Sequence, residues 1–175
     1  MATDLSATSN LPQGKLIKDV AREDAERILG EYWVPVSFPV DPFRIAEQMG
    51  IKVFLAKMSE GVSGTLIKRS GEPAGIYLNV NESGLRQNFT CAHEIGHYID
   101  RSRKNDLEYS FQDLRNGAPN TPIEFYADHF AANLTMPEKE FLACFDAGYT
   151  VKDLMMYFAV SEASVETRIR SLRLV

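Results

Sequence analysis

Residues 93–97 read His-Glu-Ile-Gly-His, and this motif constrains the chain more than any other feature of its sequence. In an α-helix, residues four positions apart lie about 40° apart around the axis and about 6 Å apart along it. His93 and His97 therefore share one helical face, where their two imidazole nitrogens can bind one zinc ion. Glu94 flanks that face, and from there it can take a proton from a metal-bound water molecule. The motif thus predicts a helix that carries two metal ligands and a general base.

A plainer interpretation is that the two histidines share a helix for packing alone. Apolar residues recur around the motif at helical spacing, namely Phe89, Ala92, Ile95, Tyr98 and Ile99. Gly96 inside this helix costs about 1 kcal/mol relative to alanine, which indicates close packing against another element. We favour the metal interpretation because two histidines with a glutamate between them at this spacing rarely arise by chance.

A catalytic zinc site has a third protein ligand and keeps one position open for water. The candidates are Asp100, Glu124, Asp128 and His129. Asp100 lies on the motif helix one turn beyond His97, from which the reach to a shared ion is awkward. Glu124 and Asp128 are four apart and share one face of a second helix, whereas His129 points elsewhere and is expected to be a core or surface histidine.

We expect Glu124 to close the metal site and Asp128 to accept the second ring N–H of a ligand histidine. A different role for Glu124 is also available, because residues 121–124 read Thr-Pro-Ile-Glu. This is a capping box, in which Glu124 would reach back to the N–H of Thr121 at the start of the helix. We favour the ligand role because the two histidines require a third group.

Hydrophobic periodicity predicts an α+β fold in which helices flank a small sheet. Helices are expected at about 18–30, closed by Gly30, at 41–50, 84–102 and 122–134, in one segment that ends near Gly148, and in two segments within the last 25 residues. Three β-prone runs cover 51–57, 62–69 and 74–80, and residues 103–120 are expected to form a loop. The gaps between the runs are too short for a crossover helix, so neighbouring strands should pair antiparallel.

Composition favours a cytoplasmic protein. The net charge of −5 argues against nucleic acid as the main partner, because phosphate binding requires a surplus of lysine and arginine. The two cysteines, Cys91 and Cys144, form no CxxC pair, which is typical of a reducing compartment. The N-terminus does not resemble a signal peptide, and no apolar run is long enough to span a membrane.

The motif HEIGHYI and the later segment EFYADHFAANLTMP, Glu124 to Pro137, together resemble the ImmA/IrrE family of zinc metallopeptidases. The paired carboxylates also resemble the ExxxD motif of gluzincins, and the resemblance runs from about residue 20 to the end. It implies a zincin-like fold with a small three-stranded, mainly antiparallel sheet packed on the HExxH helix. It also implies zinc, or manganese, bound by His93, His97 and Glu124, with Glu94 as the general base and Asp128 supporting a ligand histidine.

We expect the chain to divide into three parts. Residues 1–16 would be a flexible polar tail, 17–137 the metallopeptidase domain, and 138–175 a C-terminal helical region packed on the same unit. The last two helices are similar to a helix-turn-helix, but their near-balanced charge argues against DNA binding. The sequence departs from the family in having LTMP where LLMP is usual, and we expect no separate sensor module.

Members of this family cleave a helix-turn-helix repressor and so relieve repression in phages, mobile elements or stress responses. We therefore expect a zinc-dependent endopeptidase whose substrate strand adds antiparallel to an exposed edge among residues 62–80. Tyr98 and Tyr126 are candidates for oxyanion stabilisation, although core packing is the favoured role for each. The alternatives are a repressor-binding or toxin–antitoxin protein that does not cleave, and a protein with a structural metal or none and a DNA-binding tail.

Overall fold

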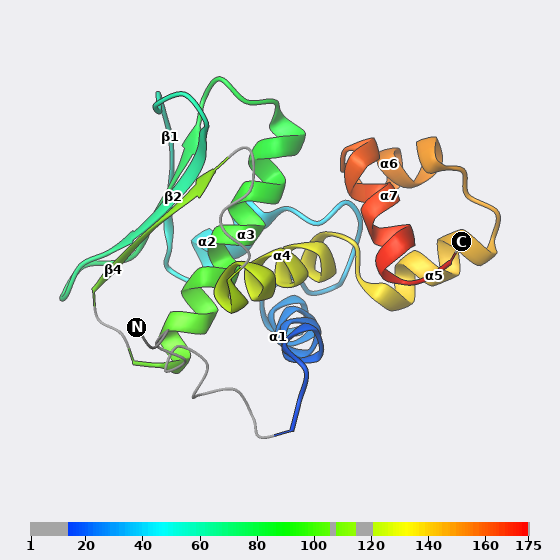
Figure 1. Cartoon of the computed structure of the whole chain (residues 1–175), viewed down its shortest axis with the longest axis horizontal. Coiled ribbons are helices and arrows are strands. Elements are labelled where there is room, and N and C mark those ends of the chain that lie inside the picture. Colours follow the sequence, from blue (N-terminus) through cyan, green and yellow to red (C-terminus); the bar gives the residue numbers. More distant parts are fainter. Residues whose placement is uncertain (1–13, 106–107, 115–120, 175) are drawn as a thin grey trace, which may run out of the picture.

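The computed structural model describes residues 14–105, 108–114 and 121–174, in which a four-stranded sheet lies against a layer of helices (Figure 1). The strands are β1 (Lys52–Ala56), β2 (Val62–Lys68), β3 (Gly75–Asn79) and β4 (Tyr109–Leu114). The helices are α1 (Ile17–Tyr32), α2 (Pro42–Gln48), α3 (Gly84–Arg103), α4 (Pro122–Thr135), α5 (Glu138–Asp146), α6 (Val151–Phe158) and α7 (Glu162–Ser171). The α+β class is confirmed, and most of the predicted tail, residues 1–13, lies outside the described residues. None of the described helices has the length and apolar character needed to cross a membrane.

The strand order is β1-β3-β2-β4, which differs from the expected pairing of neighbours. β2 and β3 do form an antiparallel pair, in which Thr65 lies opposite Tyr77. However, β1 pairs with β3 in parallel, with Val53 opposite Ile76, and not with β2. Two parallel strands need a long connection between them, which is usually a helix. Here the strand β2 and the turns on either side of it connect β1 to β3.

The fourth strand, β4, lies within residues 103–120, so the prediction of a loop there is wrong where the chain is described. β4 pairs antiparallel with β2, with Asp113 opposite Gly64, and the sheet has four strands where three were expected. Both β2 and β3 are therefore paired on two sides, and the edges of the sheet are β1 and β4. The expected free edge among residues 62–80 does not exist in this structure.

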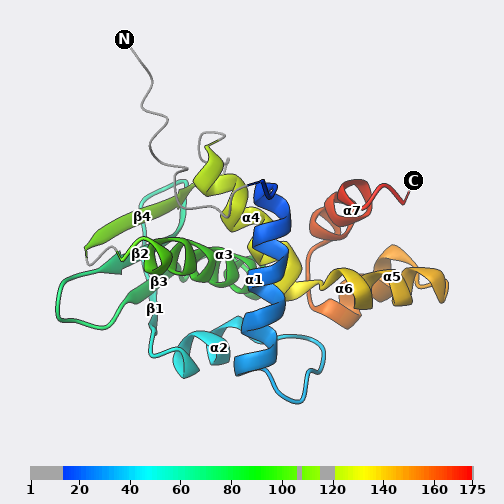
Figure 2. The ribbon, with the colours of Figure 1, turned by 90° about the horizontal axis from the view of Figure 1, so that it is seen from below.

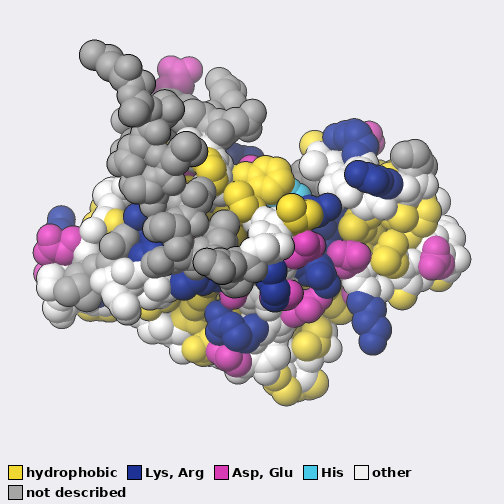
Figure 3. Space-filling view, turned by 60° about the horizontal axis from the view of Figure 1, so that its bottom comes forward, with side chains coloured by type: hydrophobic (Ala, Val, Ile, Leu, Met, Phe, Trp, Pro, Cys, Tyr) yellow, Lys and Arg dark blue, Asp and Glu magenta, His cyan; other side chains and the backbone are white. Residues whose placement is uncertain are grey.

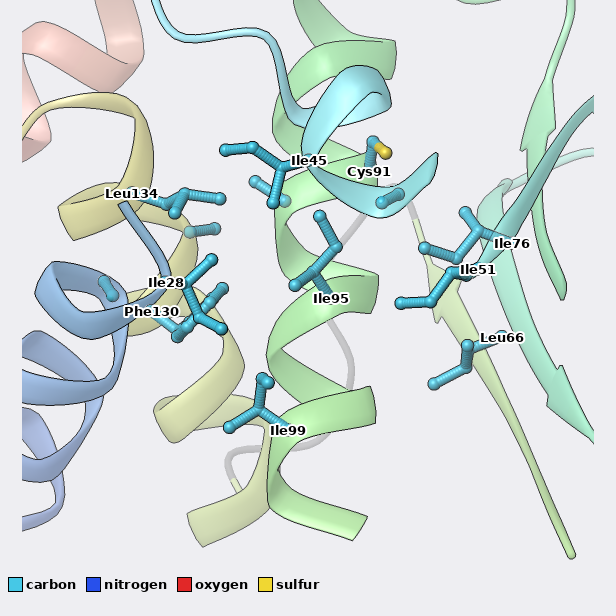
Figure 4. Packing of buried hydrophobic residues seen from close by; sticks show 14 of the residues in the cluster. Ile28, Ile45, Ile51, Leu66, Ile76, Cys91, Ile95, Ile99, Phe130 and Leu134 are labelled. Atoms are coloured by element: carbon cyan, nitrogen blue, oxygen red, sulfur yellow. The ribbon is translucent and has the colours of Figure 1, made fainter. Parts of the chain in front are cut away.

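Helix α3 lies at the centre of the main hydrophobic cluster (Figure 4). Its residue Ile95 lies between Ile28 of α1 and Phe130 of α4 on one side and Ile76 of the sheet on the other. All four side chains are almost completely buried. The helix α1 packs on α4 (Figure 2). It continues to Tyr32, so the prediction that it ends at Gly30 is wrong.

The C-terminal helices α5, α6 and α7 enclose a second hydrophobic cluster, which lies to one side of the larger body (Figure 1). Phe141, Phe158 and Val165 are among its buried residues. The side chain of Phe38 packs against both clusters and stacks on Tyr157 with ring centroids 5.5 Å apart. Because the clusters share Phe38, the division of the chain at residues 137 and 138 stays a prediction.

Gly64 allows β2 to approach α3 very closely. A Cβ atom at this position would lie 2.4 Å from Thr90 Cγ2 and 3.2 Å from Glu94 Oε1. Gly30 in α1 is the opposite case, because nothing lies within 4 Å of its ideal Cβ position.

We expect Gly64→Ala to lower the free energy of unfolding by about 1–3 kcal/mol, because the added methyl group overpacks the contact with α3. Gly30→Ala is the matched control and should raise stability by about 0.5–1 kcal/mol, since alanine loses less backbone entropy in a helix. Urea denaturation of the two variants and the parent measures both changes. A Gly64→Ala protein as stable as the parent would contradict the close approach.

Candidate metal centre

Helix α3 holds the HExxH motif between the sheet and α4. The helix begins after Ser83, whose hydroxyl accepts the N–H of Arg86 at 3.3 Å. Three turns later, His93, Glu94 and His97 are 3%, 0% and 1% exposed. Groups that are usually charged or hydrated are rarely buried this deeply unless a structural or chemical role requires it.

Helix α4 brings Glu124 to the two histidines. Thr121 caps this helix by accepting the N–H of Glu124 at 3.3 Å, and Pro122 occupies the first turn. The carboxylate of Glu124 lies elsewhere, with Oε2 3.2 Å from His93 Nε2 and Oε1 3.4 Å from His97 Nε2. Because the Thr121 side chain caps the helix, the Glu124 carboxylate is free of the capping role and can lie beside the histidines.

The three side chains have the spacing of a zinc site. The Nε2 atoms of His93 and His97 are 2.9 Å apart, and one ligand atom from each of the three residues lies within 4.8 Å of the others. Ligands about 2.0–2.1 Å from a tetrahedral zinc ion lie about 3.3 Å from one another, close to the observed distances. Two nitrogens and one carboxylate oxygen are also a donor set that zinc prefers, so these residues fit a zinc ion.

Glu124 is ionised in this arrangement. Burial raises the pKa of its carboxyl group, but hydrogen bonds and charge interactions with His93 and His97 outweigh burial and bring the pKa down to about 2. The site therefore supplies an anionic oxygen beside two imidazoles, which suits a divalent cation.

Asp128 contacts the first histidine of the motif from the same face of α4. Its Oδ1 lies 2.9 Å from His93 Nδ1. An N–H on Nδ1 that donates to this carboxylate leaves Nε2 as the acceptor nitrogen, and Nε2 is the atom that faces Glu124. The predicted placement of Asp128 beside a histidine of the motif is therefore observed.

The other candidates for a third ligand lie away from this cluster. Asp100 pairs with Lys104 at 2.8 Å. The ring of His129 lies against Phe125 with centroids 4.2 Å apart, and burial is the first cause that lowers its pKa. Within the described part of the chain, neither residue joins the group that could hold a metal ion.

The two tyrosines considered for oxyanion stabilisation contribute to packing. The hydroxyl of Tyr126 donates to Asp24 of α1 at 2.7 Å, and the ring is buried in the main cluster. Tyr98 is half-buried and packs against the same cluster.

The carboxylate of Glu94 lies where β2 passes over α3, beside Gly64. Sequence analysis did not assign this glycine a role, although an isolated glycine in a strand is typical of a close backbone approach. Burial, followed by the charge of Glu94, raises the pKa of the neighbouring Cys91 thiol, which makes it a poor nucleophile.

Comparison with known proteins agrees with the motifs. The sequence profile of the family described as the IrrE N-terminal-like domain (Peptidase_M78) matches residues 46–170. No curated protein matches the chain significantly.

Among solved structures, a Mycobacterium tuberculosis transcriptional regulator has a similar fold, with a TM-score of 0.58 and 15% sequence identity. The similarity covers 87% of this chain and 50% of the regulator, so the chain spans half the length of that protein. At this identity the likeness concerns the fold alone. With a profile match over most of its length, the chain belongs to the Peptidase_M78 family, whose domain is IrrE N-terminal-like.

Proposed function

We propose that the chain is a zinc-dependent endopeptidase that acts in the cytoplasm. The observation that carries this proposal is the convergence of His93, His97 and Glu124 beside the buried carboxylate of Glu94. The family supports peptidase activity in general terms. The ligand set, the general base and zinc itself, with manganese as the alternative ion, are parts of the proposal.

Each residue has a separate task in the proposed reaction. A bound zinc ion would polarise the scissile carbonyl and lower the pKa of a water molecule. Glu94 takes one proton from that water as its oxygen attacks the carbonyl carbon, and then returns the proton to the amine that leaves when the C–N bond breaks. Asp128 keeps the His93 ring in one orientation and one tautomer through its contact with Nδ1.

The proposed substrate is a helix-turn-helix repressor, whose cleavage would relieve repression. Support for this part comes from the resemblance of the two motifs to the ImmA/IrrE family. β4 pairs with β2 opposite Gly64, the residue beside Glu94, so a substrate must approach Glu94 past β4 and not by adding directly to β2.

We expect about one zinc ion per chain in the parent and a sharp loss of zinc in His97→Ala and Glu124→Ala, because each removes a ligand. Asp128→Asn should bind zinc about 10–100-fold more weakly, since the His93 ring loses its orienting carboxylate. Metal analysis after dialysis and competition with a zinc chelator measure both effects.

His129→Ala is the matched control, because this histidine lies on α4 outside the cluster, and it should keep the parent's zinc. Zinc retained at the parent's affinity in Glu124→Ala would show that Glu124 is not a ligand. A metal-free parent after purification with excess zinc would favour the alternative of a repressor-binding protein that does not cleave.

We expect Glu94→Gln to keep its zinc and to lose about 10²–10⁴-fold in cleavage rate, because glutamine has nearly the same shape but cannot accept the proton. The assay labels new protein N-termini in cells that express either the parent or the variant together with the candidate repressor.

Glu60→Gln, at an exposed position before β2, is the control and should cleave as the parent does. New N-termini within a helix-turn-helix protein that occur with the parent alone support the proposal. A zinc-loaded parent that binds the repressor and leaves it intact would contradict it, as would undiminished cleavage by Glu94→Gln.

A further inference from the structure

Helices α4 and α7 face each other across a gap that two hollows occupy. One hollow, of about 350 Å³, lies between α7 and the α3–α4 face, and the other, of about 420 Å³, lies between α7 and the start of α1. Arg168 of α7 and His129 of α4 line both hollows. Lys and Arg side chains occur next to Asp and Glu side chains where the larger body meets the C-terminal helices (Figure 3).

Arg168 of α7 is almost completely buried in this gap, and Glu138 is the first of the charged groups that act on it. The Arg168 side chain is 4% exposed, and one terminal nitrogen donates to Asn133 Oδ1 at 2.7 Å. Its Nε has no hydrogen-bond partner, and the guanidinium forms no ion pair, among the residues that the structure describes. Burial lowers the pKa of this group to about 10, so it remains charged at neutral pH. A buried cation of this kind is costly unless an anion pairs with it.

The two carboxylates that line the larger hollow also lie near another arginine. Glu138 lies 3.9 Å from Arg22, and Asp19 lies 4.0 Å from the same arginine. Lys18 and Arg173 add two more cationic side chains to the hollow's lining. The chain as a whole is acidic, so the surplus of positive charge here is local.

The smaller hollow connects Arg168 with the candidate metal centre. Asp128, which contacts His93, lines this hollow together with Arg168. Phe89, Ala132 and Met136 form an apolar part of its wall, beside serine, threonine and charged side chains. A free inorganic anion would leave this wall uncovered, whereas a peptide with an apolar residue next to an acidic one would cover it and also reach the guanidinium.

We propose that the smaller hollow is a subsite for the peptide substrate, in which Arg168 binds the carboxylate of an acidic residue and the apolar wall binds its neighbour. This inference rests on the proposed peptidase function and specifies the substrate class, a segment with an acidic residue beside an apolar one. Arg168 acts here as a specificity residue, because a guanidinium donates paired hydrogen bonds to a carboxylate but not to an amide of the same shape.

The test uses the zinc-loaded Glu94→Gln protein and the NMR signal of the Arg168 Nε–H group. The probes are N-acetyl-Leu-Glu-amide, its matched control N-acetyl-Leu-Gln-amide, and inorganic phosphate. We expect the Glu peptide to shift the Arg168 signal and to bind about tenfold more tightly than the Gln peptide, because hydrogen bonds to a charged group are stronger. Arg168→Lys assigns the signal by removing it, and Arg173→Lys is the control that should leave it in place.

Arg168→Gln should abolish the preference for the Glu peptide. Since the shift itself is observed with Arg168 intact, the test does not depend on whether that variant folds. Equal shifts with both peptides would overturn the proposal, as would no shift with either peptide. A shift with phosphate alone would also overturn it and would make the hollow an inorganic anion site.

The NMR result tests the subsite independently of the proposed peptidase activity, because no cleavage takes place in this experiment. If the Glu peptide binds but the parent cleaves nothing, the acidic-peptide site is supported and the peptidase function is contradicted. If the parent cleaves but neither peptide affects Arg168, the peptidase function is supported and this subsite is contradicted.

Discussion

The close contact between α3 and α4 at Gly96 is the constraint on which the candidate metal centre depends. A Cβ atom on Gly96 would lie 3.1 Å from the Cα of Ala127, so any larger residue would push the helices apart. Ala127 lies between Glu124 and Asp128 in the sequence of α4, and both carboxylates reach the histidines of α3 from there. Glycine is a poor helix former, and its cost of about 1 kcal/mol is offset by the approach that it permits.

Helix α4 serves two parts of the molecule with two of its faces. Glu124 and Asp128 are four apart and point at the histidines, while His129 and Asn133, also four apart, line the gap beside α7. Asn133 donates to the carbonyl of His129 and accepts from Arg168, which connects α7 to α4 through hydrogen bonds. The candidate metal centre and the gap are therefore arranged around the same rigid helix.

Local sequence patterns predicted those parts of the structure that depend on helical geometry. The spacing of His93 and His97 placed both side chains on one buried face, and the structure brings Glu124 close to them. The ambiguity between cap and ligand at Glu124 was real, because Thr121 does cap α4. What failed was the expected pairing of β1 with β2, since a β-prone run has the same period whichever neighbour it pairs with. The strand β4 was also missed, because its residues were assigned to a loop.

The sequence by itself determined the family through two short motifs, the fold class through hydrophobic periodicity, and the shared helical face of His93 and His97 through their spacing. Tertiary structure alone decided the parallel pairing of β1 with β3, the position of β4 beside β2, and the burial of Arg168 between α4 and α7. These features join segments that are distant in the chain. Periodicity shows which side of a segment is buried, but which segment covers it is decided by how the whole chain packs.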